Sequence, residues 1–233
     1  GVNDAPALKQ ADIGIAMGIT GTEVSKDAAS MILTDDNFAT IVKAVATGRN
    51  IYANIKNAII YLLSGNLSGI LCVLSASLLS LRVPFLPVHL LFINLVTDSL
   101  PAIAIGMERS AKDVLKEKPR DPSVGILTPQ TMKQLGIQGI LIALVTMTAY
   151  FMGLQGSWAQ ATTMAFSTLC LARLFHGFNC RSQRSLAHIG LFSNRYSIMA
   201  FVIGFCFLTA ILMIPALHSL FSVTTISMSQ LLT

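Results

Sequence analysis

The sequence predicts a mainly α-helical, polytopic transmembrane helix bundle preceded by a short remnant of an α/β domain. Hydrophobic residues occupy 53% of the 233 positions and charged residues only 12%, which excludes an ordinary water-soluble domain. The charges are also segregated, because residues 57–81, 134–172 and 196–233 contain none. A membrane-spanning helix needs about 20 apolar residues, so these stretches predict several crossings of a bilayer.

Residues 1–36 lack membrane character and are predicted to be the C-terminal part of a cytoplasmic α/β domain. Residues 12–18, DIGIAMG, predict a short buried strand that ends at a glycine. Residues 22–33 predict a helix, for which Thr22 is a candidate N-cap. Residues 1–6, GVNDAP, predict a loop after a strand. Small and polar residues in such a loop are typical of a phosphate or metal site, and a plain turn is the alternative.

Residues 37–81 form the longest continuous helical pattern, which at 1.5 Å per residue corresponds to about 67 Å. The hydrocarbon core of a bilayer is only about 30 Å thick, so the first part of this helix must project into the cytoplasm. We therefore expect a cytoplasmic stalk at residues 37–56 and a transport domain at residues 57–233. We expect this rigid helix to couple the cytoplasmic domain to the membrane domain. The alternative is a long helix without such a coupling role. The expected spans lie at about 57–81, 84–106, 134–153, 157–178 and 196–217, with the start of another near 226–233.

The distribution of basic residues predicts the orientation of the bundle. Lysines and arginines gather before the first span, in residues 107–133 and in residues 179–195, whereas the other connections carry only Arg82. Because cytoplasmic loops are rich in Lys and Arg, the N-terminal segment is predicted to be cytoplasmic. The net charge of +5 does not indicate a nucleic-acid partner, since the sequence has no aromatic–basic cluster and no nucleic-acid motif.

The strongest functional signal within the spans is residues 92–106, FINLVTDSLPAIAIG. An ionisable group such as Asp98 is costly inside a membrane and usually marks a pathway or a binding site. Asn94 and Thr97 lie four and one residues before it, so a regular α-helix would place all three on one face. Pro101 lacks an N–H and is expected to free the carbonyl four residues back. These oxygens predict a site for a hard cation. The alternative is a kinked packing helix whose aspartate pairs with a neighbouring Arg or Lys.

Two other spans carry candidate residues. Asn66 offers an amide oxygen at the middle of the first span, where Gly65 and Gly69 form a pair of small residues that permits close helix packing. Arg173 is the second charge within the predicted spans. It either extends towards the cytoplasmic headgroups or faces the interior of the bundle.

Three motifs resemble the P-type ATPases. Residues 1–18, GVNDAPALKQADIGIAMG, resemble the hinge motif of that family, and residues 26–57 resemble its passage from phosphorylation domain into stalk. Residues 94–106, NLVTDSLPAIAIG, resemble the sixth transmembrane helix of its calcium pumps. The resemblance implies a haloacid-dehalogenase-like phosphorylation domain attached to ten membrane helices. This chain would hold the end of that domain, helices five to nine and the start of ten.

The resemblance also implies roles for individual residues. Asn3 and Asp4 match family residues beside the phosphate and its Mg²⁺. Gly69 and Arg173 fall where two-site calcium pumps carry glutamates, which implies one calcium site. An arginine there could supply positive charge close to Asp98 once the cation leaves, in place of some countertransported protons. The positions that match calcium ligands are Asn66, Asn94, Thr97 and Asp98.

The implied function is ATP-driven Ca²⁺ transport through an aspartyl-phosphate. Since the chain begins with glycine and ends in an apolar run, we interpret it as a piece of a longer pump, inactive alone. The expected partners are the missing N-terminal part and the lipid bilayer, in a bacterial plasma membrane. ATP and Mg²⁺ would be bound mainly by that missing part. The alternatives are a pump for Mn²⁺ or Na⁺, or a passive channel or membrane subunit, which would need no phosphorylation domain.

Overall fold

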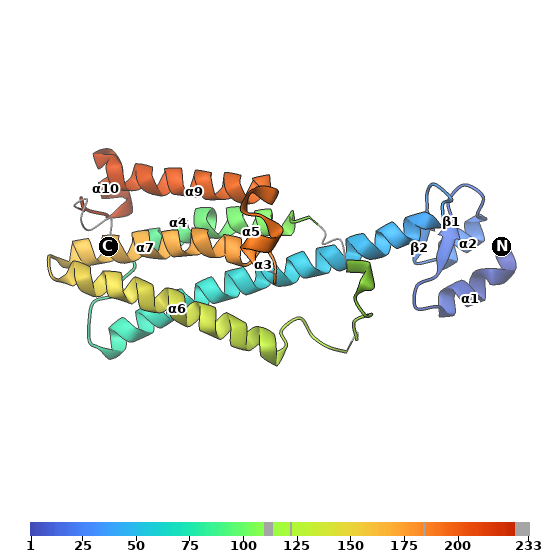
Figure 1. Ribbon diagram of the computed structural model, residues 1–233, viewed down its shortest axis with the longest axis horizontal. Helices are drawn as coiled ribbons and strands as arrows, with labels where there is room; N and C mark the ends of the chain where they lie inside the picture. The colour runs from blue at the N-terminus through green and yellow to red at the C-terminus, as the bar shows by residue number, and fades with distance from the viewer. Residues whose placement is uncertain (110–113, 122, 184, 227–233) are drawn as a thin grey trace. The chain divides into compact units, whose positions relative to one another are not determined.

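The computed structural model describes residues 1–109, 114–121, 123–183 and 185–226. The start of a further span, expected at 226–233, lies almost entirely outside them. The chain divides into two compact units: Gly1–Ile51 with Ser110–Lys118, and Tyr52–Arg109 with Pro119–Thr233. The mainly α-helical fold class is confirmed, because the described residues contain one two-stranded sheet and are otherwise dominated by helices (Figure 1).

The first unit has a small α/β arrangement. Its strands β1 and β2 are parallel, with Ile15 opposite Met31 and Met17 opposite Leu33. The strand predicted within residues 12–18 is therefore confirmed. The elements are the 3-10 helix η1 (Val2–Asp4), α1 (Ala5–Gln10), β1 (Ile15–Met17), α2 (Glu23–Ala28), β2 (Met31–Leu33) and the 3-10 helix η3 (Val114–Lys116).

Two predictions for the first unit are corrected. The helix expected at residues 22–33 ends at Ala28, because Ala29 is extended and residues 31–33 pair with β1 instead. A short apolar run suits a helix or a strand, and only a partner strand distant in sequence decides between them. The loop expected at residues 1–6 is helical: Pro6 lies in the first turn of α1, where its missing N–H costs nothing. The N-cap is confirmed, since Thr22 Oγ1 accepts the Ser25 N–H.

The long helix predicted at residues 37–81 is confirmed as α3, which runs from Ala39 to Leu78. Its 40 residues include no proline and correspond to about 60 Å. In the second unit one side of α3 is buried, and that side is rich in small and polar residues. The buried residues of α3 are Asn54, Asn57, Ile60, Tyr61, Ser64, Gly65, Ser68, Cys72 and Ala76.

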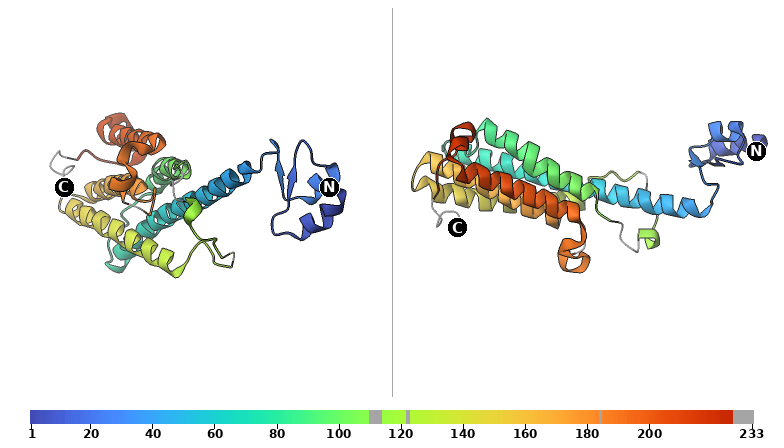
Figure 2. Two further views of the ribbon diagram at one scale, coloured as in Figure 1. Left: turned by 45° about the vertical axis from the view of Figure 1, so that its right-hand side comes forward. Right: turned by 90° about the horizontal axis from the view of Figure 1, so that it is seen from above.

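The second unit packs further helices around this side of α3. The helices α6 and α7 lie side by side and antiparallel, joined by a short turn, and α9 packs against α5 and α7 (Figure 2). Side chains cap three of these helices, since Thr128, Ser157 and Asn194 each accept a backbone N–H of the first turn. The elements are α4 (Pro87–Phe92), η2 (Ile93–Asp98), α5 (Ser99–Gly106), α6 (Pro129–Leu154), α7 (Trp158–Asn179), α8 (Leu186–Ile189), the 3-10 helix η4 (Leu191–Ser193), α9 (Arg195–Met213) and α10 (Pro215–Phe221).

Within the described residues, four helices are long and apolar enough to cross a membrane: α3, Pro87–Gly106, α6 and α9. The helix α7, expected as a span at 157–178, is not one of the four, because polar side chains such as Thr163 and His176 lower its mean hydropathy. Its crossing of the bilayer stays a prediction. The span expected at 196–217 ends earlier than predicted, at Met213, since Pro215 cannot continue α9 and instead begins α10.

Candidate functional site

The helix Pro87–Gly106 changes its hydrogen-bonding pattern where the candidate site begins. Residues 93–98 form η2, a π-helical segment between α4 and α5. A π-helix has wider turns than an α-helix, and such segments often occur at functional sites. Thr97 and Asp98 are buried here, whereas Asn94 is exposed. The three oxygens that were expected on one face therefore differ in burial, within a segment that departs from the assumed α-helical repeat. Their joint role in one cation site stays a prediction.

Pro101 does not end the helix, because it lies buried in the first turn of α5. It nevertheless alters the hydrogen bonding at the site. With no N–H at Pro101, the Thr97 carbonyl cannot accept from four residues further on, and it accepts the Tyr61 hydroxyl of α3. The Thr97 hydroxyl in turn donates to the Ile93 carbonyl at 2.9 Å. The predicted free carbonyl is thus bound to α3.

An ion pair between two helices forms the centre of the site. Arg173 Nη2 of α7 lies 2.6 Å from Asp98 Oδ1, and the two side chains are 3% and 5% exposed. Of the two orientations considered for Arg173, the structure has the one that faces the bundle. The pairing of Asp98 with a neighbouring arginine, first considered as an alternative to a cation site, is present in this conformation. A buried pair of this kind depends on both partners, since either alone would be an uncompensated charge.

The pair is incompletely hydrogen-bonded. Arg173 Nε and Nη2 and Asp98 Oδ1 are buried without a partner in hydrogen-bonding geometry. Buried polar atoms in native proteins usually have such partners, so their absence marks a place of strain, chemistry or an additional bound species.

A buried polar cluster continues along α7 from the ion pair. His176 Nε2 lies 2.9 Å from Ser64 Oγ and 3.2 Å from Cys180 Sγ, and its ring stacks on Tyr61. The sequence analysis did not identify these residues. Their spacing was a usable signal, because Tyr61 and Ser64 are three residues apart on α3, and His176 and Cys180 are four apart on α7.

The other predicted site residues differ from this pair in burial. Asn66 is exposed on α3, and Gly69 is half-buried with open space beside its Cα. Asn3 and Asp4 are exposed on η1 in the first unit. In the part of the chain that the structure describes, no three His, Cys, Asp or Glu residues are grouped so that they could hold a metal ion. The structure therefore brings together Thr97, Asp98 and Arg173 of the predicted set.

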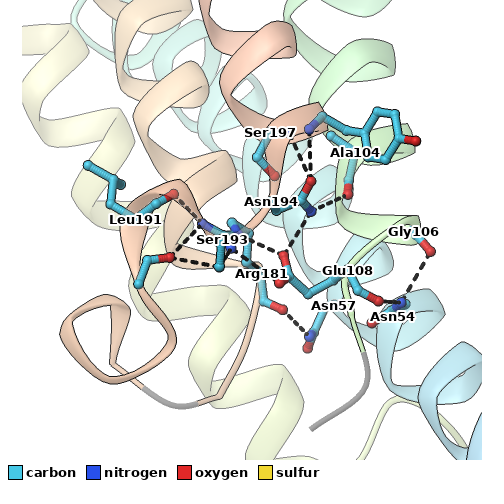
Figure 3. A network of polar contacts seen from close by, with 12 residues as sticks. Asn54, Asn57, Ala104, Gly106, Glu108, Arg181, Leu191, Ser193, Asn194 and Ser197 are labelled. Atoms are coloured by element: carbon cyan, nitrogen blue, oxygen red, sulfur yellow. Dashed lines mark hydrogen bonds and ion pairs between the residues drawn. The ribbon is translucent and has the colours of Figure 1, made fainter.

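A second buried polar network begins where α5 ends (Figure 3). Arg181, 1% exposed, donates from Nε to Glu108 Oε2 at 2.7 Å and from Nη2 to Ser193 Oγ at 2.6 Å. Asn194 donates to the same Glu108 oxygen and to the Ala104 carbonyl, both at 2.9 Å. The segment before α9 is thereby joined to the end of α5.

The same network includes α3 (Figure 3). Asn54 Nδ2 donates to the carbonyls of Gly106 and Glu108, at 3.1 and 2.9 Å. Asn57 Nδ2 donates to the Arg181 carbonyl at 3.2 Å. The helix that carries Asp98 is therefore bound to α3 both at the ion-pair level, through Tyr61, and at its C-terminal end.

Comparison with known proteins shows the family to which the chain belongs. Residues 82–233 match the family model of the C-terminus of cation-transporting ATPases. The chain is 50% identical over 224 residues to a calcium-transporting ATPase of Listeria monocytogenes, covering 96% of this chain and 25% of that protein. It is 45% identical over 230 residues to a calcium-transporting ATPase of Bacillus subtilis, covering 97% of this chain and 26% of that protein. It is 36% identical over 238 residues to calcium-transporting ATPase type 2C member 1 of Homo sapiens, covering 100% and 26%. The chain spans about a quarter of the length of these curated relatives.

Proposed function

Because the chain belongs to the cation-transporting ATPases, we propose that it is the C-terminal part of an ATP-driven calcium pump and holds part of one intramembrane Ca²⁺ site. The observation that carries the proposal is the buried carboxylate of Asp98 on an apolar 20-residue helix. An intramembrane carboxylate is costly and marks an ion pathway by default. Calcium is favoured over Mn²⁺ and Na⁺ because the relatives of known name are calcium-transporting ATPases and the available donors are oxygens.

Arg173 gives the site its own counter-charge in this proposal. Calcium binding requires that the guanidinium leave the Asp98 carboxylate, from which it is 2.6 Å distant in this conformation. When the cation departs, the guanidinium returns and neutralises a carboxylate that would otherwise stay charged and buried. The site then needs fewer countertransported protons. Gly69, with no side chain, supplies no second carboxylate, which is consistent with one ion per cycle.

Neutral oxygens complete the proposed calcium shell. The amides of Asn66 and Asn94 are exposed on the second unit and so are available to a shell that other parts of the pump complete. Thr97 offers its hydroxyl oxygen, which keeps acceptor capacity while it donates to the Ile93 carbonyl. Calcium takes six to eight oxygen ligands, so one carboxylate alone would not suffice.

The first unit would serve the phosphoryl chemistry. Asn3 and Asp4 present an amide and a carboxylate oxygen at an exposed site, which is the donor type that Mg²⁺ takes. ATP and the phosphorylated aspartate belong to other parts of the pump, so this piece by itself should not hydrolyse ATP. In this proposal residues 1–36 are cytoplasmic and the pump resides in a bacterial plasma membrane.

The test uses the intact pump in sealed vesicles. We expect vanadate-sensitive ATP hydrolysis and ion uptake that Ca²⁺ stimulates. We expect Asp98→Asn to weaken apparent calcium affinity by about tenfold or more, because ligand charge sets calcium affinity. Glu117→Gln, at an exposed position in the first unit, is the matched control and should have no effect.

Three results would contradict the proposal. Unchanged calcium-stimulated turnover in Asp98→Asn would remove Asp98 from the site. ATP hydrolysis that is stimulated by Mn²⁺ or Na⁺ but not by Ca²⁺ would mean that calcium is not the transported ion. Calcium flux that needs no ATP would indicate a passive channel.

A further inference from the structure

The guanidinium of Arg173 lies directly against the backbone of α3 at Gly65. A Cβ atom placed on Gly65 would be 2.2 Å from Arg173 Nη2, 2.4 Å from Cζ and 2.6 Å from Nε. Real Cβ atoms essentially never approach other heavy atoms within 3.0 Å. Any side chain at residue 65 would therefore force the guanidinium to move.

The atoms that would clash are those that hold Asp98. The same Nη2 that is 2.2 Å from the Gly65 Cβ position is 2.6 Å from Asp98 Oδ1. The three residues come from α3, η2 and α7, and all are buried. The guanidinium is a rigid plane, so displacing its Nη2, Cζ and Nε together moves the whole charged group. A side chain at residue 65 would thus occupy the space that the guanidinium takes beside the carboxylate.

Close helix packing is the other explanation for a glycine at position 65, and Gly69 provides a comparison. Gly69 lies one turn further along α3 and completes the pair of small residues noted in the sequence. A Cβ placed on Gly69 would meet nothing within 4 Å. A Cβ at Gly69 thus meets no neighbouring helix, whereas the three atoms nearest to a Cβ at Gly65 all belong to the Arg173 guanidinium.

We propose that Gly65 is a positioning residue for the Arg173–Asp98 pair. The space left by its missing side chain holds the guanidinium, which competes with the transported cation for Asp98. This inference rests on the proposed function for its link to calcium. Its structural part, the dependence of the ion pair on Gly65, stands on the contacts alone. Gly65 itself touches no ion.

The test is a double-mutant cycle in the intact pump, with Gly65→Ala, Arg173→Ala and the double variant. Without calcium, Gly65→Ala should lower the midpoint of thermal inactivation, because Asp98 loses its buried partner. In the Arg173→Ala background the same substitution should have little effect, since no guanidinium remains to be displaced. Gly69→Ala is the matched control and should not lower the midpoint in either background, because alanine favours a helix over glycine and meets open space there.

The second readout is the calcium concentration that gives half-maximal ATP hydrolysis. Gly65→Ala should lower it by roughly fivefold, a typical size for coupling between two ligands of one site. The double variant should match Arg173→Ala. A Gly65→Ala effect that persists undiminished without the arginine, or an equal effect of Gly69→Ala, would overturn the inference.

The two proposals fail in distinguishable ways. If the unmodified pump shows no calcium-stimulated hydrolysis, the proposed function fails while the thermal cycle still decides the role of Gly65. If Gly65→Ala cannot be purified in a folded form, the double variant decides. Recovery of a folded pump when Arg173 is also replaced would support the role of Gly65 in positioning the guanidinium. Continued failure of the double variant would overturn it.

Discussion

At the scale of single residues, the buried ion pair explains how this membrane bundle tolerates a carboxylate. Desolvation disfavours the charge of Asp98, and the guanidinium of Arg173 compensates for it at 2.6 Å. The compensation is incomplete, because Arg173 Nε and Nη2 and Asp98 Oδ1 lack partners in hydrogen-bonding geometry.

A first prediction concerns proton countertransport. In the proposed transport cycle, replacing Arg173 with Gln removes the permanent charge that neutralises Asp98 after calcium leaves, and a proton is then the available substitute. We expect about one additional proton countertransported per calcium ion, since a buried carboxylate without a cationic partner favours its protonated form. The measurement is vesicle pH change against calcium uptake in the intact pump.

The control for this prediction is Arg195→Gln, because Arg195 is exposed at the start of α9. It should leave the ratio of protons to calcium unchanged. An unchanged ratio in Arg173→Gln as well would mean that the guanidinium does not act as the counter-charge.

At the scale of helices, two local features of the helix Pro87–Gly106 shape the site. The π-helical segment η2 buries Thr97 and Asp98 while leaving Asn94 exposed, and Pro101 makes the Thr97 carbonyl available to Tyr61. At the other end of the same helix, the Ala104 carbonyl accepts from Asn194, which also caps α9. One side chain thus determines both where α9 begins and how it contacts α5.

A second prediction follows from this cap. Asn194→Ala removes the acceptor for the N–H groups of Tyr196 and Ser197 and the donor to Ala104. Loss of a cap costs about 1 kcal/mol, and the buried carbonyl left without its donor adds about 1–3 kcal/mol. The midpoint of thermal inactivation of the intact pump should fall. Asn179→Ala, at an exposed position at the end of α7, should leave it unchanged, and equal midpoints for the two variants would contradict the assignment.

At the scale of the second unit, the network around Arg181 and Glu108 joins segments that are far apart in the sequence. It connects α3 through Asn54, the end of α5 through Glu108 and the start of α9 through Asn194. Arg181 is almost fully buried, so its charge depends on the Glu108 carboxylate. We interpret this network as the structure that keeps the helix of Asp98 in register with α3.

A third prediction tests that interpretation. Glu108→Gln leaves the Arg181 charge buried without compensation, which costs about 3–5 kcal/mol when one member of a buried pair is removed. The intact pump should lose thermal stability, and adding Arg181→Met should restore part of it. The control is Glu117→Gln, at an exposed position. If the double variant is no more stable than Glu108→Gln, the pair does not act as a unit.

The sequence by itself determined the membrane character, the long helix α3, the strand near residue 15 and the cap at Thr22. Each of these depends on composition or on the spacing of neighbouring residues, which the sequence records directly. It also identified Asp98 and Arg173 as the unusual charges, because a charge within an apolar run is visible without coordinates.

Only the tertiary structure decided how these residues combine. The pairing of β2 with β1, the burial of Arg173 against Gly65 and Asp98, and the capture of the Thr97 carbonyl by Tyr61 all join residues distant in the chain. The π-helical segment at residues 93–98 likewise departs from the α-helical repeat assumed from the sequence. Such choices depend on which surfaces meet in the folded bundle, and the free energy of those contacts is absent from any local pattern.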